Sequence, residues 1–434
     1  MQKKMIAICI IGMVLLTSIP TLSALEINET TNPIQSLSTA NTIYVDDDFD
    51  SSTPGWQVDH FDKIQDGIDA AEDGDTVFVF SGIYNETITI DKSINLISEN
   101  KNTTIINGSH NDDVIKITSS NIFLDGFMIK NGTDFGKAGI KIIECSDPQT
   151  KIHISNCSIY NNFKGICIIK SSNIFVFDCT ITDSYTIAID VYDSKENFQI
   201  KDCYIGNNGK AGIFFLCQSV IDIPTDIHIY DCNIINNKWD GICFCEGGKN
   251  VKIYNNKITN NSWGGIAFNV AINTHIYNND INDNNEDGIS ILDHQSGQVH
   301  STNVCIENNR ISNNDCGIYL QSCHDNSIYH NRLDKNNKNA YDDGSNIWYN
   351  SETEEGNWWS DYKGKDSDGD GIGDIPYNIP GKIIPNKDLY PLGKFKKGKS
   401  LDRVMHPALN NILDILVKFL AQHPLLFQIL EKLL

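Results

Sequence analysis

Residues 151–169 read KIHISNCSIYNNFKGICII, and residues 173–191 read NIFVFDCTITDSYTIAIDV. Six further segments align with these two, and they begin at Asn197, Asp226, Asn250, Asn273, Asn303 and Asp325. One column of the alignment recurs at intervals of 22 to 30 residues and runs Cys157, Cys179, Cys203, Cys232, Asn256, Asn279, Asn309 and Asn331. A repeat of this length, sustained over so many segments, is typical of a solenoid.

Each segment contains short runs in which apolar and polar residues alternate, as around Ile152 and Ile154. A strand of this kind buries one face. One coil cannot bury that face alone, so successive coils stack, with their strands pairing in parallel about 4.8 Å apart. The sequence therefore predicts an all-β fold, a right-handed parallel β-helix solenoid whose repeats occupy residues 111–350.

Stacking places equivalent positions above one another, so we interpret the Cys-to-Asn column as a ladder that points inward. Cys behaves as a small hydrophobic residue when buried, and stacked Asn side chains can hydrogen-bond one another. The alternative is a soft-metal site, formed by Cys157, Cys179, Cys203 and Cys232. Stacked neighbours point the same way, which is poor geometry for enclosing an ion, so packing is favoured. Packing is also favoured for Cys243 and Cys245.

A glycine opens the second strand of six segments, at Gly165, Gly212, Gly241, Gly265, Gly288 and Gly317. Glycine adopts backbone conformations with positive φ without penalty. We therefore expect a tight corner at these positions, with a left-handed backbone.

Both ends of a parallel β-helix expose unpaired strand edges and need caps. At the front, residues 42–110 are expected to form an N-terminal cap and the first irregular coils. They include a strand at Thr42–Val45 and a short helix within Asp59–Ala71. At the rear, residues 351–392 are expected to form a C-terminal cap, to which Trp358 and Trp359 contribute aromatic surface.

The two terminal segments differ from this body in composition. Residues 1–24 resemble a signal peptide, with Lys3 and Lys4 at the start, an apolar stretch at 5–16 and Ala24 at a small-residue cleavage site. Residues 25–41 follow as a linker. The apolar stretch is too short to span a membrane. The mature protein is therefore expected to be secreted or to lie at the cell surface, with no transmembrane span.

Residues 393–434 form an amphipathic pattern that predicts a helical tail. Asp414, Lys418 and Pro424 argue against a membrane-spanning anchor. Three interpretations stay open for 401–434: an extra cap on the solenoid, a helix that binds a partner, or an interfacial attachment to a surface.

An Asp-rich loop within the C-terminal cap has the spacing of a calcium-binding loop. Carboxylates alternate at Asp366, Asp368 and Asp370, glycine stands at the sixth position, and Asp374 at the ninth. The Ile372 carbonyl supplies a further oxygen. Tyr377 stands at the twelfth position, where an EF-hand has a bidentate Glu, so a weak Ca²⁺ site is expected rather than a regulatory one.

The formal net charge of −22 repels phosphate backbones, which argues against nucleic-acid binding. The acidic balance suits a soluble protein outside the cell. The expected partners are an extracellular or cell-surface polysaccharide or a glycoprotein.

Two functions follow from this scaffold. The first is a non-catalytic role in carbohydrate binding, surface adhesion or surface structure, with Trp239, Trp263 and Asn269 as candidate contacts. The second is a polysaccharide-processing enzyme (a lyase, hydrolase or epimerase), which needs paired carboxylates around one sugar unit.

The candidate catalytic residues are Asp240 and Asp287, which precede aligned glycines two coils apart, and His294 in a nearby insertion. Acidic residues are abundant throughout the chain, however, so their coincidence in one region is weak evidence of catalysis. The non-catalytic function is therefore favoured.

The repeats resemble the parallel β-helix repeats of pectin-lyase-like proteins. The motif around Ile43–Asp48 is similar to the N-terminal caps of that superfamily. The ending at Asn357–Tyr362, with the Asp-rich loop and Asp388–Leu392, resembles NosD-like exported proteins. That resemblance implies a third function, a copper-handling accessory role. A copper carrier is expected to offer Met and His clusters, whereas this chain has 5 Met and 11 scattered His, so the residues themselves do not favour copper.

Overall fold

The computed structural model describes residues 40–108, 112–219, 222–293, 299–382 and 385–393. The expected signal peptide, most of the linker, the tail at 394–434 and His294 lie outside the described residues. Within the described ranges, no helix combines the length and the hydrophobicity that crossing a membrane requires.

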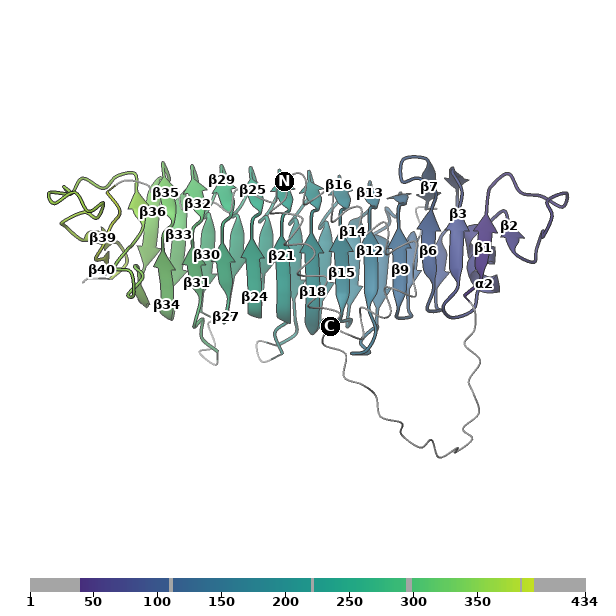
Figure 1. Cartoon of the computed structure of the whole chain (residues 1–434), viewed down its shortest axis with the longest axis horizontal. Coiled ribbons are helices and arrows are strands. Elements are labelled where there is room, and N and C mark those ends of the chain that lie inside the picture. The colour runs from purple at the N-terminus through teal and green to yellow at the C-terminus, as the bar shows by residue number, and fades with distance from the viewer. Residues whose placement is uncertain (1–39, 109–111, 220–221, 294–298, 383–384, 394–434) are drawn as a thin grey trace, which may run out of the picture. The chain divides into compact units, whose positions relative to one another are not determined.

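Three long parallel sheets run along the stacked coils (Figure 1). In each regular coil the chain passes through one strand of sheet A, then one of sheet B, then one of sheet C. Each strand pairs with its equivalents in the coils before and after, as β12 (Ile152–Ser155) pairs with both β9 (Ile122–Asp125) and β15 (Ile174–Phe177). This arrangement is the all-β, right-handed parallel β-helix that the repeat predicts.

The strands of sheet A, in spatial order, are β2 (His60–Phe61), β1 (Thr42–Val45), β3 (Thr76–Val79), β6 (Asn95–Ser98), β9, β12, β15, β18 (Glu196–Lys201), β21 (Thr225–Tyr230), β24 (Gly248–Tyr254), β28 (His275–Tyr277), β31 (Cys305–Glu307), β34 (His324–Tyr329) and β37 (Ser345–Ile347), with β27 (Ala271–Ile272) beside β24.

Sheet B consists of β38 (Trp358–Trp359), β35 (Arg332–Asp334), β32 (Arg310–Ser312), β29 (Asp280–Asn282), β25 (Lys257–Thr259), β22 (Asn233–Ile235), β19 (Tyr204–Gly206), β16 (Thr180–Thr182), β13 (Ser158–Tyr160), β10 (Met128–Lys130), β7 (Thr104–Asn107) and β4 (Gly82–Tyr84). Sheet C consists of β36 (Lys338–Asp342), β33 (Cys316–Gln321), β30 (Ile289–Leu292), β26 (Ile266–Phe268), β23 (Ile242–Phe244), β20 (Ile213–Leu216), β17 (Ile189–Tyr192), β14 (Lys164–Ile169), β11 (Ala138–Ile143), β8 (Ile115–Ile117) and β5 (Ile88–Ile90).

The core is built from columns of β-branched and aromatic side chains that the register stacks between coils. One column of sheet B is fully buried and runs Ile159, Ile181, Ile205, Ile234, Ile258, Ile281, Ile311 and Leu333. In sheet C, Phe244 stacks on Phe215 and Phe268 with ring centroids 4.6 and 4.3 Å apart. Fully burying each such side chain contributes roughly 1.5–3 kcal/mol, so the repeated column is itself the driving force for stacking.

Asn and Asp make the corners between sheets, because these residues tolerate a left-handed backbone. At the corner between sheets A and B, Asn156, Asp178 and Asn278 have φ of 52°, 52° and 56°. The six glycines at the beginning of the sheet C strands do not adopt positive φ, so our expectation of a left-handed corner there is wrong. They permit close approach of coils instead: a Cβ on Gly241 would lie 2.6 Å from Ile258 Cγ2 and 2.8 Å from the Gly265 carbonyl oxygen.

The Cys-to-Asn column directly follows these left-handed residues, and its side chains point into the core. Every member is at most 2% exposed. In the first half, each thiol donates to the backbone carbonyl two residues earlier, as Cys179 Sγ does to Phe177 at 3.3 Å. In the second half, Asn256 Nδ2 donates to Asn279 Oδ1 at 3.0 Å, and Asn279 donates in the same way to Asn309. The inward ladder predicted from the sequence is confirmed.

The described cysteines, twelve in all, are free thiols. This fits the interpretation of most of them as packing residues, since the ladder thiols already bond backbone carbonyls.

The caps differ from the regular coils. Helix α2 (Ile64–Ala70) packs Ile64 and Ile68 against the first coil and is shorter than the 13-residue segment that the sequence indicates, because His60–Phe61 instead joins sheet A as β2. The Glu86 carboxylate accepts from the amides of Ile64 and Gln65 at the start of the helix. At the other end, the antiparallel pair β39 (Tyr377–Ile379) and β40 (Asn386–Asp388) follows the last coil.

Candidate functional site

A second amide ladder lies at the corner between sheets B and C, which we call the BC corner. Asn237 Nδ2 donates to Asn261 Oδ1 at 3.0 Å, Asn261 to Asn284 at 3.0 Å and Asn284 to Asn314 at 3.1 Å. This column was not predicted from the sequence, although Asn recurs at each of these positions in the aligned segments. The residues that follow the ladder stack in register between coils, as Trp263 N donates to Trp239 O at 3.3 Å.

Aromatic side chains project from this corner over several coils. Trp239 and Trp263 stack on each other with ring centroids 5.0 Å apart and an interplanar angle of 8°, and Trp263 is 43% exposed. Lys210 Nζ lies over the other face of Trp239, 4.6 Å from its centroid. Nearer the N-terminus, Tyr185 is exposed and stacks on Phe163.

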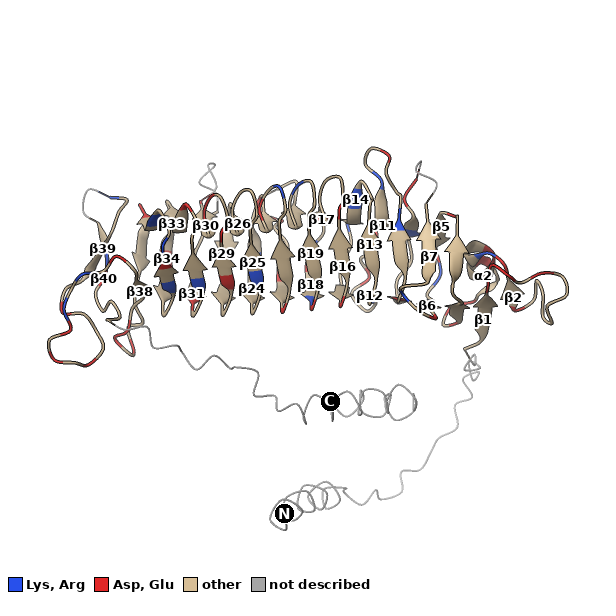
Figure 2. Cartoon of the chain, turned by 90° about the horizontal axis from the view of Figure 1, so that it is seen from above, with Lys and Arg blue, Asp and Glu red and all other residues tan. Residues whose placement is uncertain are grey.

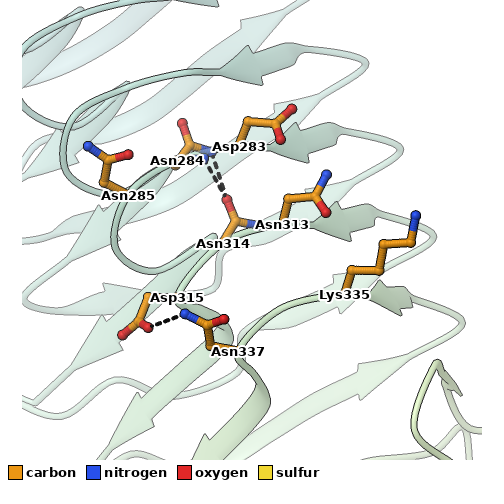
Figure 3. A pocket seen from close by; sticks show the side chains of 8 residues that line it. All are labelled: Asp283, Asn284, Asn285, Asn313, Asn314, Asp315, Lys335 and Asn337. Atoms are coloured by element: carbon orange, nitrogen blue, oxygen red, sulfur yellow. Dashed lines mark hydrogen bonds between the residues drawn. The ribbon is translucent and has the colours of Figure 1, made fainter.

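A polar hollow of about 470 Å³ continues the same corner toward the C-terminus (Figure 3). Its lining consists of Asp283, Asn284, Asn285, Asn313, Asn314, Asp315, Lys335 and Asn337. Backbone hydrogen bonds join it to the tryptophans, because Glu286 N donates to Trp263 O at 3.1 Å and Asp315 N donates to Glu286 O at 2.9 Å. The aromatic side chains and the hollow are therefore parts of one continuous edge, which we call the BC edge.

Asp240 and Asp287 lie on this edge, next to the tryptophans. Burial raises the pKa of Asp240 to about 6, while the Gly264 amide, 2.9 Å from its Oδ1, lowers it. Burial also raises the pKa of Asp287 to about 6, followed by the charges of nearby carboxylates, among them Asp240. Gly264 occupies the coil between them, so the two lie about 10 Å apart along the axis.

The other candidates from the sequence lie elsewhere. Asn269 follows β26, whereas Trp263 precedes it, so the two lie at opposite ends of this strand. The Asn269 side chain donates to the Cys245 carbonyl. His294 is outside the described residues. Beside that segment, Asp293 Oδ1 accepts from the Ser301 amide at 2.6 Å and Oδ2 contacts His300 Nδ1 at 2.5 Å.

The Asp-rich loop brings three predicted ligands together. Carboxylate oxygens of Asp366, Asp368 and Asp370 all lie within 4.8 Å of one another. Asp374 instead turns one oxygen to Ser367, whose hydroxyl donates to it at 2.5 Å. The loop is closed by an isolated bridge between Ile372 and Leu392.

A mixed cluster on the outer face of sheet A was not anticipated from the sequence. One ligand atom each from His275, Cys305 and Glu307 lies within 4.8 Å of the others. His275 Nε2 is 2.8 Å from Glu307 Oε1. Burial lowers the pKa of His275, but hydrogen bonds to Cys305 and Glu307 outweigh it and raise that pKa to about 9. The alignment contains the signal, because His275 and Cys305 occupy the same column.

Comparisons with known proteins give one family match and several similar solved structures. The family model described as periplasmic copper-binding protein (NosD) matches residues 68–263 and 219–364. No curated protein matches the sequence. Similar solved structures include the A-module of a mannuronan C-5 epimerase from Azotobacter vinelandii (14% identity, TM-score 0.42, covering 66% of this chain and 74% of that one). Others are an alginate lyase from Paenibacillus sp. (12%, 0.44, 72% and 98%) and a polygalacturonase from Erwinia carotovora (12%, 0.40, 74% and 97%).

At such identities and TM-scores the solved structures carry no inference about activity. The match to the family model is stronger evidence, since its two matched ranges together span most of the chain. On that coverage, the chain belongs to the NosD family.

Proposed function

We propose that this protein binds a neutral polysaccharide along the BC edge and does so outside the cytoplasm, as a secreted or cell-surface protein. The observation that carries the proposal is the continuity of exposed aromatic side chains with an amide-lined hollow along successive coils. Aromatic surface packs against the apolar face of a sugar ring, and amides and carboxylates pair with its hydroxyl groups.

Charge favours a neutral ligand over an anionic one. The hollow contains Asp283 and Asp315 against one Lys335, and Glu286 lies on the coil between Trp263 and Asp315. The whole chain carries −22, so an anionic polysaccharide is repelled both locally and at a distance. Acidic residues also recur in turns and at both caps (Figure 2).

The test is a binding screen of the mature chain against neutral and anionic polysaccharides. Replacing Trp263 by Ala removes the most exposed tryptophan face of the edge, and we expect roughly tenfold weaker binding of the neutral ligand. The matched control is Tyr254→Ala, which deletes a ring from a stack on sheet A, away from the BC edge. Equal affinity for wild type and Trp263→Ala, or no neutral ligand across a broad panel, would refute the proposal.

A polysaccharide-processing activity is the second candidate, and the two carboxyl groups with a raised pKa favour it. Groups that titrate near pH 6 can exchange protons with a substrate near neutral pH. If Asp240 and Asp287 form an acid–base pair, shortened or unsaturated sugars should be released with an optimum near pH 6. Asp287→Asn should abolish that release while leaving binding intact. Binding without product release leaves the first function standing alone.

We also propose that Ca²⁺ binds the Asp-rich loop through Asp366, Asp368 and Asp370. Clustered carboxylates repel one another, and an ion of hard oxygen preference relieves that repulsion. Calcium should then raise the melting temperature of the wild-type chain but not that of Asp368→Asn, a variant that loses ligand charge and keeps the side-chain size. An equal rise in both chains would remove this site from consideration.

A further inference from the structure

The outer face of sheet A carries an arrangement that is absent from the proposed carbohydrate edge. Strands β28 and β31 pair in parallel so that His275 lies opposite Cys305 and Tyr277 lies opposite Glu307. Cys305 and Glu307 are two residues apart on one strand and so share a face. His275 and Cys305 are vertical neighbours, and Glu307 reaches His275 diagonally, so an imidazole, a thiol and a carboxylate converge from two coils.

This diagonal geometry is what the Cys ladder lacks. In the ladder, equivalent side chains point the same way into the core and bond backbone carbonyls. In the cluster, the side chains approach one point from three backbone positions, with His275 Nε2 and Glu307 Oε1 2.8 Å apart. Ligand atoms around a tetrahedral Zn²⁺ lie roughly 3.5 Å apart, so small side-chain rotations suffice to admit an ion.

Neighbouring rings shelter the cluster on two sides. The Tyr277 ring lies 4.2 Å from the His275 ring, and the Cys305 thiol donates to the Tyr329 hydroxyl at 3.4 Å from the next coil. The side chains of His275 and Glu307 are 36% and 21% exposed. The ligand atoms are thus partly withdrawn from water but still reachable by an ion, on a protein whose net charge attracts cations.

We propose that His275, Cys305 and Glu307 form a binding site for a divalent cation of borderline softness, of the Zn²⁺ class. Nitrogen, sulfur and oxygen ligands in one site suit such cations and do not suit Ca²⁺ or Mg²⁺, which take oxygen ligands. Three protein ligands leave a fourth, exchangeable position for water. The site is independent of the polysaccharide proposal and of the Asp-rich loop.

The alternative explanation is a His275–Glu307 ion pair with no metal. That pair needs only two of the three side chains and does not involve the Cys305 thiol, which donates to the Tyr329 hydroxyl. Elsewhere in the same column, His228 faces Gln199 and Lys252 on the adjacent strands, so it has the imidazole without the thiol or the carboxylate. His228 therefore provides a matched control on the same sheet and the same face.

The test measures Zn²⁺ binding to the reduced, chelator-treated mature chain in excess calcium, which occupies oxygen-only sites. We expect wild type and His228→Ala to bind one equivalent at this site. His275→Ala and Cys305→Ser should each raise Kd by at least about tenfold, since even partners of a ligand contribute that much. With Co²⁺ as the probe, wild type and His228→Ala should show thiolate-to-cobalt charge-transfer absorption that Cys305→Ser lacks.

Glu307→Gln keeps a hydrogen-bond acceptor for His275 but removes the charge, so it should weaken Zn²⁺ binding while the fold is retained. Circular dichroism of all four variants checks that the coils remain intact. The proposal is overturned if wild type binds no Zn²⁺ at one equivalent. It is also overturned if the His275, Cys305 and Glu307 variants bind like wild type, because the metal then sits elsewhere.

Discussion

The two halves of the Cys-to-Asn column hold the same backbone with different chemistry. In the half from Cys157 to Cys232, thiols fill the position and make weak bonds to carbonyls of their own coil, at 3.1 to 3.3 Å. Three of them also make longer contacts to carbonyls of the preceding coil, at 3.5 to 3.7 Å. In the half from Asn256 to Asn331, each side-chain amide donates to the next coil at 2.9 to 3.0 Å, and the last acceptor is Asn357 in the C-terminal cap. Each acceptor oxygen also accepts from the backbone amide of the preceding coil. The same backbone corner therefore accepts either a small buried thiol or a hydrogen-bonded amide.

The difference matters because losing a thiol and losing an amide should affect stability differently. A thiol that is lost leaves a small void and few unmade hydrogen bonds. An amide that is lost interrupts a chain in which every donor and acceptor is buried, and an unsatisfied buried group destabilises by about 1–3 kcal/mol. The Asn half should consequently be the more stable and the more fragile to substitution.

The largest effect is expected from Asn279→Ala. This change removes the acceptor of both Asn256 N and Asn256 Nδ2 and the donor to Ile253 O. With several buried groups left unpaired, the free energy of unfolding should fall by about 3–5 kcal/mol, as measured by urea denaturation. Cys203→Ala, in the same column, should lower it by only about 1 kcal/mol.

Similar losses for the Asn279 and Cys203 variants would contradict the comparison, since side-chain volume alone would then decide the position. Hydrogen exchange of the Asn256 and Asn309 amides would locate the damage. Protection should be lost around the substituted coil first, because each coil is stabilised mainly by its neighbours.

A smaller effect is expected where the Asn half ends. Asn357 N donates to Asp388 Oδ2 at 2.7 Å, and Trp359 Nε1 donates to the same atom at 2.9 Å. Burial nevertheless raises the pKa of Asp388 to about 6. A carboxyl whose pKa is raised on folding stabilises the folded state below its unfolded pKa near 3.9, and this stabilisation is lost as pH rises through about 6.

Asp388→Asn should therefore remove the part of the pH dependence of stability that arises from this carboxyl group. Between pH 7 and pH 5, the wild-type C-terminal cap should gain about 1–2 kcal/mol from this group, and the Asn variant should not. The measurement is the difference between the two melting temperatures at each pH, so that titrations shared by both chains cancel. A difference that is constant with pH would mean that Asp388 is ionised in both states.

Much of this architecture follows from the sequence, because a solenoid repeats one local solution. The period, the inward column and the strand at Thr42–Val45 could all be predicted, since apolar alternation and register carry the same information. The glycine corners could not. A conserved spacing of glycine does not distinguish a positive φ from a close approach between coils, and here Gly241 serves the second purpose.

The candidate site was only partly predictable. Trp239 and Trp263 could be expected to meet, because they are one repeat apart. The hollow around Asn285 and Asp315 depends on how exposed side chains splay at a corner, which a linear pattern does not encode. In the His275–Cys305–Glu307 cluster, the alignment pairs His275 with Cys305 but does not indicate that Glu307 reaches His275 diagonally from the neighbouring strand.

The smallest effect is expected from Cys232→Asn, at the boundary between the two halves. Cys232 N already donates to Asn256 Oδ1 at 3.0 Å, so the acceptor that the new amide needs is in place. A backbone carbonyl that the new amide can donate to is also present. The Cys232 thiol bonds Ile200 O in the same way as Asn256 Nδ2 bonds Ile229 O. The change in unfolding free energy should stay within about 1 kcal/mol, whereas the reverse swap, Asn279→Cys, should lose about 2 kcal/mol. If Cys232→Asn instead lowers the unfolding free energy as much as Asn279→Ala, the core volume beside Cys203 sets the boundary between the Cys half and the Asn half. Hydrogen bonding then does not decide which residue the corner accepts.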